Sequence, residues 1–174
     1  SLLESPNRTL RDMVQKQLCW GQRTGARQRL VDLAATSTRP ATRLQALWTL
    51  EGLALLNPDV VAQAVQDPHP MVRRGGIRLA EGKFDDDPAL MHQLVACVDD
   101  PDPRVRLQLA CTLGESTAPE AARALAELAI TDAAEPTIAA AVISSVNSQN
   151  VGPVLAAVLA KAPGDAPLTV SKLL

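Results

Sequence analysis

The sequence predicts an all-α fold, a right-handed α-solenoid of about five antiparallel helix pairs. A seven-residue phrase, Asp67 to Arg73 (DPHPMVR), returns 33 residues later as Asp100 to Arg106 (DPDPRVR). After each copy, apolar residues recur at the spacing of a helix rather than of a strand. A repeat of this length indicates stacked helix pairs, because one pair alone cannot bury its apolar face.

Degenerate copies of the phrase extend the repeat over nearly the whole chain. Pro40 is followed by Arg43 at the same spacing, Pro136 is followed by Ala139, and Arg8 to Arg11 fits without a proline. We therefore expect one array with units at 5–36, 37–67, 68–100, 101–132 and 133–161 and a C-terminal tail at 162–174. The chain starts without Met and both ends read like repeats, so we expect a fragment of a larger protein.

Prolines mark where the helices begin. Pro40, Pro70, Pro103 and Pro136 suit the first turn of a first helix, where the missing N–H leaves no bond unmade. The second helices are expected to start at Asn57-Pro58, Asp87-Pro88 and Ala118-Pro119, with Asn57 and Asp87 as N-caps.

Composition excludes some classes of protein. The chain is 47 % apolar and only 2 % aromatic, which suits thin helices packed through small side chains. The formal charge of −2 argues against a general nucleic-acid binder, although it leaves room for a local basic strip. The longest apolar stretches are interrupted by charge or proline, so no transmembrane helix is expected.

The phrase Asp-Pro-x-Pro-x-Val-Arg at the start of a helix pair resembles HEAT repeats, particularly the phycobilisome-lyase type, over about positions 5–161. Three further phrases, 43–53, 106–115 and 141–145, look like the HEAT segment of large secreted planctomycete-type proteins. In that family a sugar-dehydrogenase-like propeller precedes the HEAT array and a haem-binding cytochrome c module follows it. The resemblance implies a spacer or docking segment of a membrane-bound dehydrogenase, located outside the cytoplasm; without it, a cytoplasmic location is expected.

This chain departs from the narrower pattern in the fifth unit. Thr137 and Ala139 stand where an aromatic residue and Arg are expected. The haem motif Cys-x-x-Cys-His is absent, so we expect no covalent haem and no other cofactor in these 174 residues.

Arg43, Arg73 and Arg106 occupy one column of the repeat, and Asp67 and Asp100 occupy another. One interpretation is a structural ladder, in which each guanidinium reaches a carboxylate at its own or a neighbouring turn. The alternative is an arginine strip that binds an anionic partner. Arg suits either role, since its planar fork pairs bidentately with carboxylate or phosphate.

The two tryptophans are conspicuous in a chain nearly free of aromatic residues. Trp48 shares a column with Arg78 and Cys111, and it either packs with its N–H hydrogen-bonded or forms part of a partner surface. Trp20 ends the first helix and either caps the core or lies bare. Cys97 and Cys111 are expected on core-facing positions as small apolar thiols.

No other group suggests chemistry. His69 lies in a turn and His92 on a helix face, and neither has a second metal ligand in register. The run Asp85 to Asp87 lacks the alternating ligands of a calcium loop, so Asp87 is expected to act as an N-cap. We expect no catalytic, cofactor or metal site in this chain.

Three functions are compatible with these observations. The leading hypothesis is a non-catalytic scaffold that binds a protein partner or separates neighbouring domains of the same chain. The alternative is a DNA-binding protein or enzyme related to the HEAT-like DNA glycosylases. A lyase or chaperone helper that positions a bilin or haem rests on analogy alone.

Overall fold

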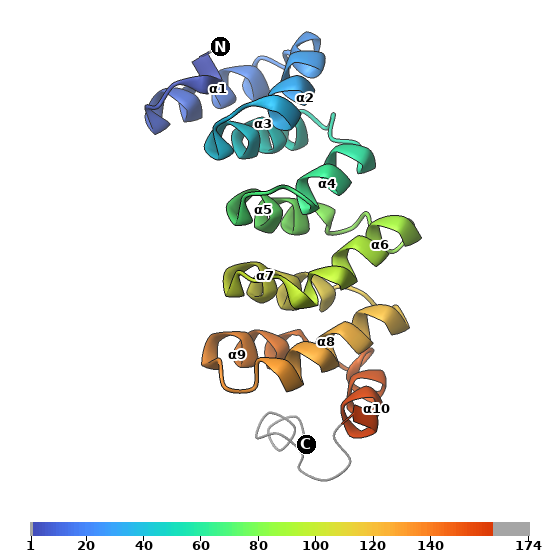
Figure 1. The fold of residues 1–174 in the computed structure, drawn as a ribbon. Helices are drawn as coiled ribbons and strands as arrows, with labels where there is room; N and C mark the ends of the chain where they lie inside the picture. Colours follow the sequence, from blue (N-terminus) through green and yellow to red (C-terminus); the bar gives the residue numbers. More distant parts are fainter. Residues whose placement is uncertain (1, 162–174) are drawn as a thin grey trace. The chain divides into compact units, whose positions relative to one another are not determined.

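A computed structural model describes residues 2–161 of the chain (Figure 1). These residues form ten α-helices and three short 3₁₀ helices, and no strand occurs among them. The prediction of an all-α fold of helix pairs is therefore confirmed.

The first helix of each pair begins where the sequence predicts. Proline occupies the first position of four of them, and the fifth is capped by Asn7, whose side chain accepts a hydrogen bond from the Leu10 N–H at 3.4 Å. Because proline lacks an N–H, it fits only where the helix leaves N–H groups unpaired. The first helices are α1 (Arg8–Trp20), α3 (Pro40–Gly52), α5 (Pro70–Ala80), α7 (Pro103–Leu113) and α9 (Pro136–Ser145).

Three of the five second helices start at the predicted prolines, Pro58, Pro88 and Pro119. The side chain of Asn57 accepts a hydrogen bond from the Val60 N–H at 3.2 Å, and that of Asp87 accepts two, from Ala89 and Leu90, at 3.1 Å each. Both predicted N-caps are therefore confirmed. The second helices are α2 (Arg27–Thr36), α4 (Pro58–Val65), α6 (Pro88–Val95), α8 (Pro119–Thr131) and α10 (Val151–Lys161), and the 3₁₀ helices are η1 (Leu2–Glu4), η2 (Thr24–Ala26) and η3 (Ala96–Asp99).

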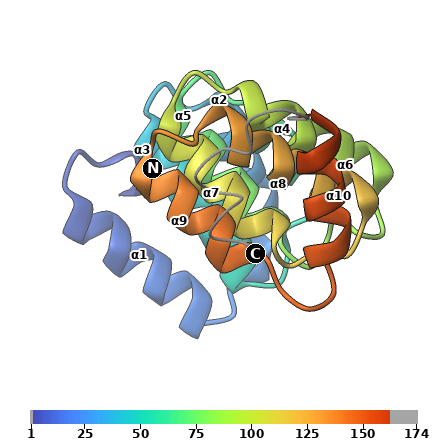
Figure 2. The same ribbon diagram turned by 90° about the horizontal axis from the view of Figure 1, so that it is seen from below.

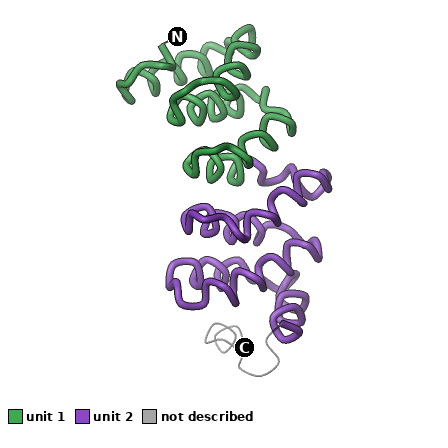
Figure 3. Tube along the Cα trace, in the orientation of Figure 1, with its two compact units in different colours: residues 1–79 green, residues 80–174 purple. Residues whose placement is uncertain are grey.

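The helices fall into two compact units, residues 1–79 and 80–174 (Figure 3). In unit 1, α2 packs against α3 and α4, while α1 packs against α3 and η1. Leucine side chains fill the space between these helices, and Leu30, Leu47 and Leu50 are at most 1 % exposed. The buried apolar side chains of these helices come mainly from α2, α3 and α4, whereas the one buried residue of α1 is Arg11.

Unit 2 shows the stacking of helix pairs clearly. The first helix α7 packs against the next first helix, α9, and the second helix α8 packs against the next second helix, α10. Each row of helices is thus continued by the equivalent helix of the following pair. Leu109, Leu113, Leu125 and Leu128 are fully buried between the rows.

Small residues allow the helices to approach closely. A Cβ atom on Gly76 of α5 would lie 2.7 Å from the carbonyl carbon of Ala64 in α4, and one on Gly114 would lie 2.6 Å from the Cβ of Ser145 in α9. Both distances are far shorter than a van der Waals contact. These two glycines are therefore required by packing rather than by an unusual backbone angle.

The prediction of a core-facing thiol at Cys111 is wrong. Cys97 is buried as expected, but Cys111 is exposed. Its neighbours in α7, Ala110 and Leu113, are fully buried, so the helix turns position 111 away from the core. Cys111 follows the exposed Arg78 by 33 residues, and this repeat position points outward in both helices.

Candidate functional site

The arginine of α3 is held by a carboxylate in a buried ion pair within unit 1. Arg43 Nε and Nη2 donate to the two carboxylate oxygens of Asp67 at 2.7 and 2.6 Å. The side chains are only 10 % and 8 % exposed. Asp67 follows the end of α4, so this pair joins the start of a first helix to the end of its own second helix. The bidentate geometry fixes the two helices against each other.

The arginine of α7 makes the equivalent pair in unit 2, with an aspartate that the sequence analysis missed. Arg106 Nε and Nη2 donate to Asp132 at 2.9 and 2.7 Å. Asp132 follows the end of α8 and is 5 % exposed. It precedes Pro136 by four residues, whereas Asp67 and Asp100 precede their prolines by three, and this extra residue hides it from the repeated phrase.

Every arginine of the column also donates to a backbone carbonyl six residues earlier. This bond closes the turn between one pair and the next, because the acceptor lies just before the helix that carries the arginine. The donor–acceptor pairs are Arg11–Ser5, Arg43–Ser37, Arg73–Asp67 and Arg106–Asp100, with distances of 2.8, 2.8, 3.0 and 2.6 Å.

The charged side chains of the repeated phrase are engaged in ion pairs and hydrogen bonds. The hydrogen-bonded carboxylate of Asp67 raises the pKa of Arg43, and Asp132 raises that of Arg106 in the same way. Asp67 Oδ1 also accepts the His69 N–H at 2.8 Å, and Asp100 Oδ1 accepts the Asp102 N–H at 2.9 Å. The charges therefore serve the connections between helices.

The arginine of α1 differs from the other members of the column. Arg11 is 9 % exposed, and its Nε is buried without a hydrogen-bond partner in the described part of the chain. The position equivalent to Asp67 in its pair is Ser37, since the carbonyl of Ser37 receives the next arginine, Arg43, as that of Asp67 receives Arg73. The first pair thus has the arginine of the ladder and lacks the carboxylate.

The proposed partner-surface residues lie at the surface. Trp20 is 79 % exposed at the end of α1, and Trp48 is 36 % exposed on α3. No hydrogen bond of the Trp48 indole N–H occurs within residues 2–161, so the expected partner for that group is absent there. Arg78 is exposed on α5. Trp48, Arg78 and Cys111 therefore mark one outward position that recurs on successive first helices.

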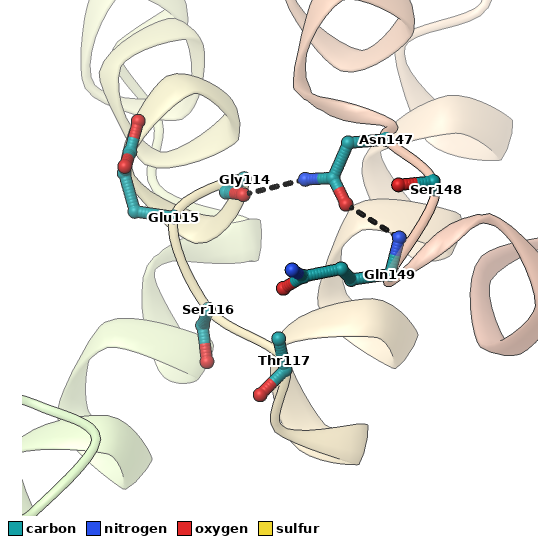
Figure 4. Close-up of a pocket in the computed structure, with 7 residues that line it drawn as sticks. All are labelled: Gly114, Glu115, Ser116, Thr117, Asn147, Ser148 and Gln149. Atoms are coloured by element: carbon teal, nitrogen blue, oxygen red, sulfur yellow. Dashed lines mark hydrogen bonds between the residues drawn. The ribbon is translucent and has the colours of Figure 1, made fainter.

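A polar hollow lies in unit 2, between the loop after α7 and the loop after α9 (Figure 4). Asn147 Nδ2 donates to the carbonyl of Gly114 at 3.2 Å and closes one side. The hydroxyl of Ser116 donates to Asp85 at 2.6 Å and accepts the Ala118 N–H at 3.0 Å, so both of its functions are structural. The volume of about 280 Å³ is small for a ligand site, and the lining is polar. The lining residues are Gly114, Glu115, Ser116, Thr117, Asn147, Ser148 and Gln149.

A larger and apolar hollow lies in unit 1, on α1. Its volume is about 460 Å³. Met13 and Leu2 on its wall are 58 % and 62 % exposed, which is unusual for large apolar side chains. The lining residues are Leu2, Leu10, Met13, Val14, Gln17, Leu18, Gly21 and Arg23.

Comparison with known families agrees with this geometry. A family model described as HEAT repeats matches residues 57–147, more than half of the chain. The chain belongs to the HEAT-repeat family. No match was found among curated proteins or among solved structures.

Other chemistry is sparse in this HEAT-repeat chain. His69 Nδ1 accepts the Met71 N–H at 3.2 Å and so caps the start of α5, while His92 lies exposed on α6. Within residues 2–161, no three His, Cys, Asp or Glu side chains are placed to hold a metal ion. No helix among these residues has the length and apolar character needed to cross a bilayer.

Proposed function

We propose that this HEAT-repeat chain is a non-catalytic scaffold that binds a protein partner and needs no cofactor of its own. The observation that carries the proposal is the use of the arginines and aspartates in packing. Arg43 and Arg106 each pair with the carboxylate of an aspartate at the end of their own helix pair. Trp20, Trp48 and Arg78 are exposed at the surface, and Trp and Arg are residue types enriched at the centres of protein interfaces.

The buried ion pairs also bear on the alternative of a DNA glycosylase. Such an enzyme needs a carboxylate that can reach a flipped-out base, yet Asp67 and Asp132 are 8 % and 5 % exposed and pair with arginine. These two aspartates are therefore not available for that role, and the net charge of −2 also disfavours a DNA-binding surface.

The narrower role that we propose is that of a spacer between the dehydrogenase propeller and the cytochrome c module of a longer protein. It rests on the resemblance of the phrases at 43–53, 106–115 and 141–145. The test is to read the gene on both sides of this segment. A propeller upstream and a Cys-x-x-Cys-His motif downstream support the spacer, and the absence of both refutes it.

Affinity purification from the source cells tests the scaffold itself. We expect one protein to be recovered in a stoichiometric amount and to stay bound after nuclease treatment. A chain that instead retains DNA, with binding that weakens steeply as salt rises, would favour the alternative. A chain recovered alone would refute the scaffold.

A further inference from the structure

The face of α1 that bears the apolar hollow is covered in the other first helices. In α3, the equivalent face points back toward the preceding helix. Thr42 Oγ1 donates to the carbonyl of Leu3 at 3.0 Å, and the carbonyl of Thr49 accepts from Cys19 Sγ at 3.9 Å. Thr42 and Thr49 are both 0 % exposed. The element that covers this face of α3 is therefore α1 with η1.

The same face is covered in unit 2. Ile138, Ala141 and Ser145 of α9 occupy the same repeat positions and are 1 %, 7 % and 8 % exposed. Ser145 lies against Gly114 at the end of α7. A helix of the preceding pair thus packs on this face in α9 as it does in α3.

In α1 the equivalent positions are Leu10, Met13 and Gln17, which lie 32 residues before Thr42, Gln45 and Thr49. Figure 2 shows α1 at the edge of unit 1, with no other helix of that unit on its outer side. The uncovered face is also more apolar than its covered counterpart in α3, because Leu and Met replace Thr and Gln. An exposed face that is more apolar than a buried one indicates a surface that is covered in the working state.

The charges around this face define what could cover it. Residues 8–29 contain six Arg or Lys and a single acidic residue, Asp12, which pairs with Arg8, while Arg11 is buried and donates to backbone carbonyls. Arg23 lines the hollow, and Lys16 lies exposed on α1. Neither side chain has a carboxylate partner within residues 2–161. Residues 1–79 hold eleven basic and six acidic residues, a formal charge of +5, whereas residues 80–174 hold six and thirteen, a charge of −7.

We infer that the hollow on α1 is a docking site for an amphipathic helix of a partner protein, with apolar residues on one side and carboxylates on its flanks. A helix is the element that covers the same face of α3 and α9, so the surface is already shaped for one. Met13, Leu10 and Leu2 receive the apolar side, and Arg23 on the wall of the hollow pairs with a carboxylate. This inference rests on the proposed scaffold function and names where its partner binds.

A synthetic peptide tests the docking site directly. The probe is a helical peptide of about 18 residues, long enough to form a marginal helix, with leucine on one face and glutamate on the flanks. Its lysine counterpart is the matched control. We expect the glutamate peptide to bind, with an affinity that falls as the salt concentration rises. The lysine peptide should bind at least about tenfold more weakly, because its charges are repelled by the basic rim of the hollow.

Two variants of the full chain locate the binding. Met13→Glu should weaken the binding of the glutamate peptide about tenfold or more, since a charge then lies in the apolar hollow. Leu159→Glu is the matched control, because Leu159 is 55 % exposed on α10 and lies outside the hollow, so binding should be unchanged. Unchanged far-UV circular dichroism confirms that both variants are folded.

Several results would overturn the docking site. These are no binding of the glutamate peptide, equal binding by Met13→Glu, or equal binding of the lysine peptide. A concentration-dependent dimer in sedimentation that Met13→Glu abolishes would identify the occupant as a second copy of the chain instead. If the natural partner is recovered by Met13→Glu as well as by the wild type, the scaffold stands and only this site fails.

Discussion

The buried pair of Arg43 and Asp67 offers the sharpest test of how the helix pairs are held. Replacing Arg43 by Met removes two charge-assisted hydrogen bonds, of 2.7 and 2.6 Å, and leaves the carboxylate of Asp67 8 % exposed. Breaking a buried pair from one side costs about 3 kcal/mol, because the remaining charge lies desolvated. We therefore expect Arg43→Met to lower the free energy of unfolding by that amount.

A double-mutant cycle separates the pair from the other bonds of each residue. Asp67→Asn keeps an oxygen for the His69 N–H, which Asp67 accepts at 2.8 Å, but removes the charge and puts an NH2 donor in place of the oxygen that accepts from Arg43 Nε. The double variant should be less destabilised than the sum of the single variants by about 2 kcal/mol, since it leaves no lone buried charge.

Urea unfolding followed by tryptophan fluorescence is the assay. Both tryptophans, Trp20 and Trp48, lie in residues 1–79, and the chain has no tyrosine, so fluorescence reports on unit 1 alone. The side chain of Arg106 in unit 2 is 19 % exposed, and Arg106→Ala should lower the free energy of unfolding by about 1–3 kcal/mol. Because unit 2 has no tryptophan, its unfolding is followed by circular dichroism. A coupling energy between Arg43 and Asp67 below about 0.5 kcal/mol would refute the ladder at that position.

Four further outcomes are expected. Ser37→Asp should stabilise unit 1 by about 1 kcal/mol by giving buried Arg11 a carboxylate, whereas Ser37→Asn should not; equal urea midpoints for the two would contradict this. Gly76→Ala should destabilise by about 2 kcal/mol or more in the same assay, since its Cβ would meet the α4 backbone at 2.7 Å, and an unchanged midpoint would count against that packing. Burial raises the pKa of Cys19, so at pH 8.5 iodoacetamide should modify exposed Cys111 before Cys19, as mass spectrometry can show. Because the pKa of this thiol is raised in the folded state, its contribution to the free energy of unfolding is complete below the ordinary thiol pKa of about 8.5. That contribution is lost as pH rises from there through the higher pKa of the folded state, and unfolding free energies that do not fall above pH ~8.5 would contradict this.

Much of the fold could be predicted because its signals are local. A proline at the first helical position and an Asn or Asp before it act within one turn, so Pro40, Pro103, Asn57 and Asp87 mark helix starts whatever surrounds them. The period of the phrase then supplies the pairing, because equivalent helices must stack on one another.

The candidate site was less predictable, because it depends on which side of each helix is covered. Cys111 differs from buried Ala110 and Leu113 only by the direction in which α7 presents it. One extra residue before Pro136 moves Asp132 out of register with the repeated phrase, yet its Oδ1 lies 2.7 Å from Arg106 Nη2 because it follows the end of α8. Such partners are 26 residues apart, beyond the reach of any local pattern.

A stack of HEAT-type helix pairs could be predicted from residue order alone, since helix caps and apolar periodicity are properties of neighbouring residues. The packed helices were needed to show that Arg43 and Arg106 pair with carboxylates and that Met13 is exposed where the equivalent face of α3 is covered. Burial and ion pairing depend on the elements that pack against a side chain, and those elements lie far apart in the sequence.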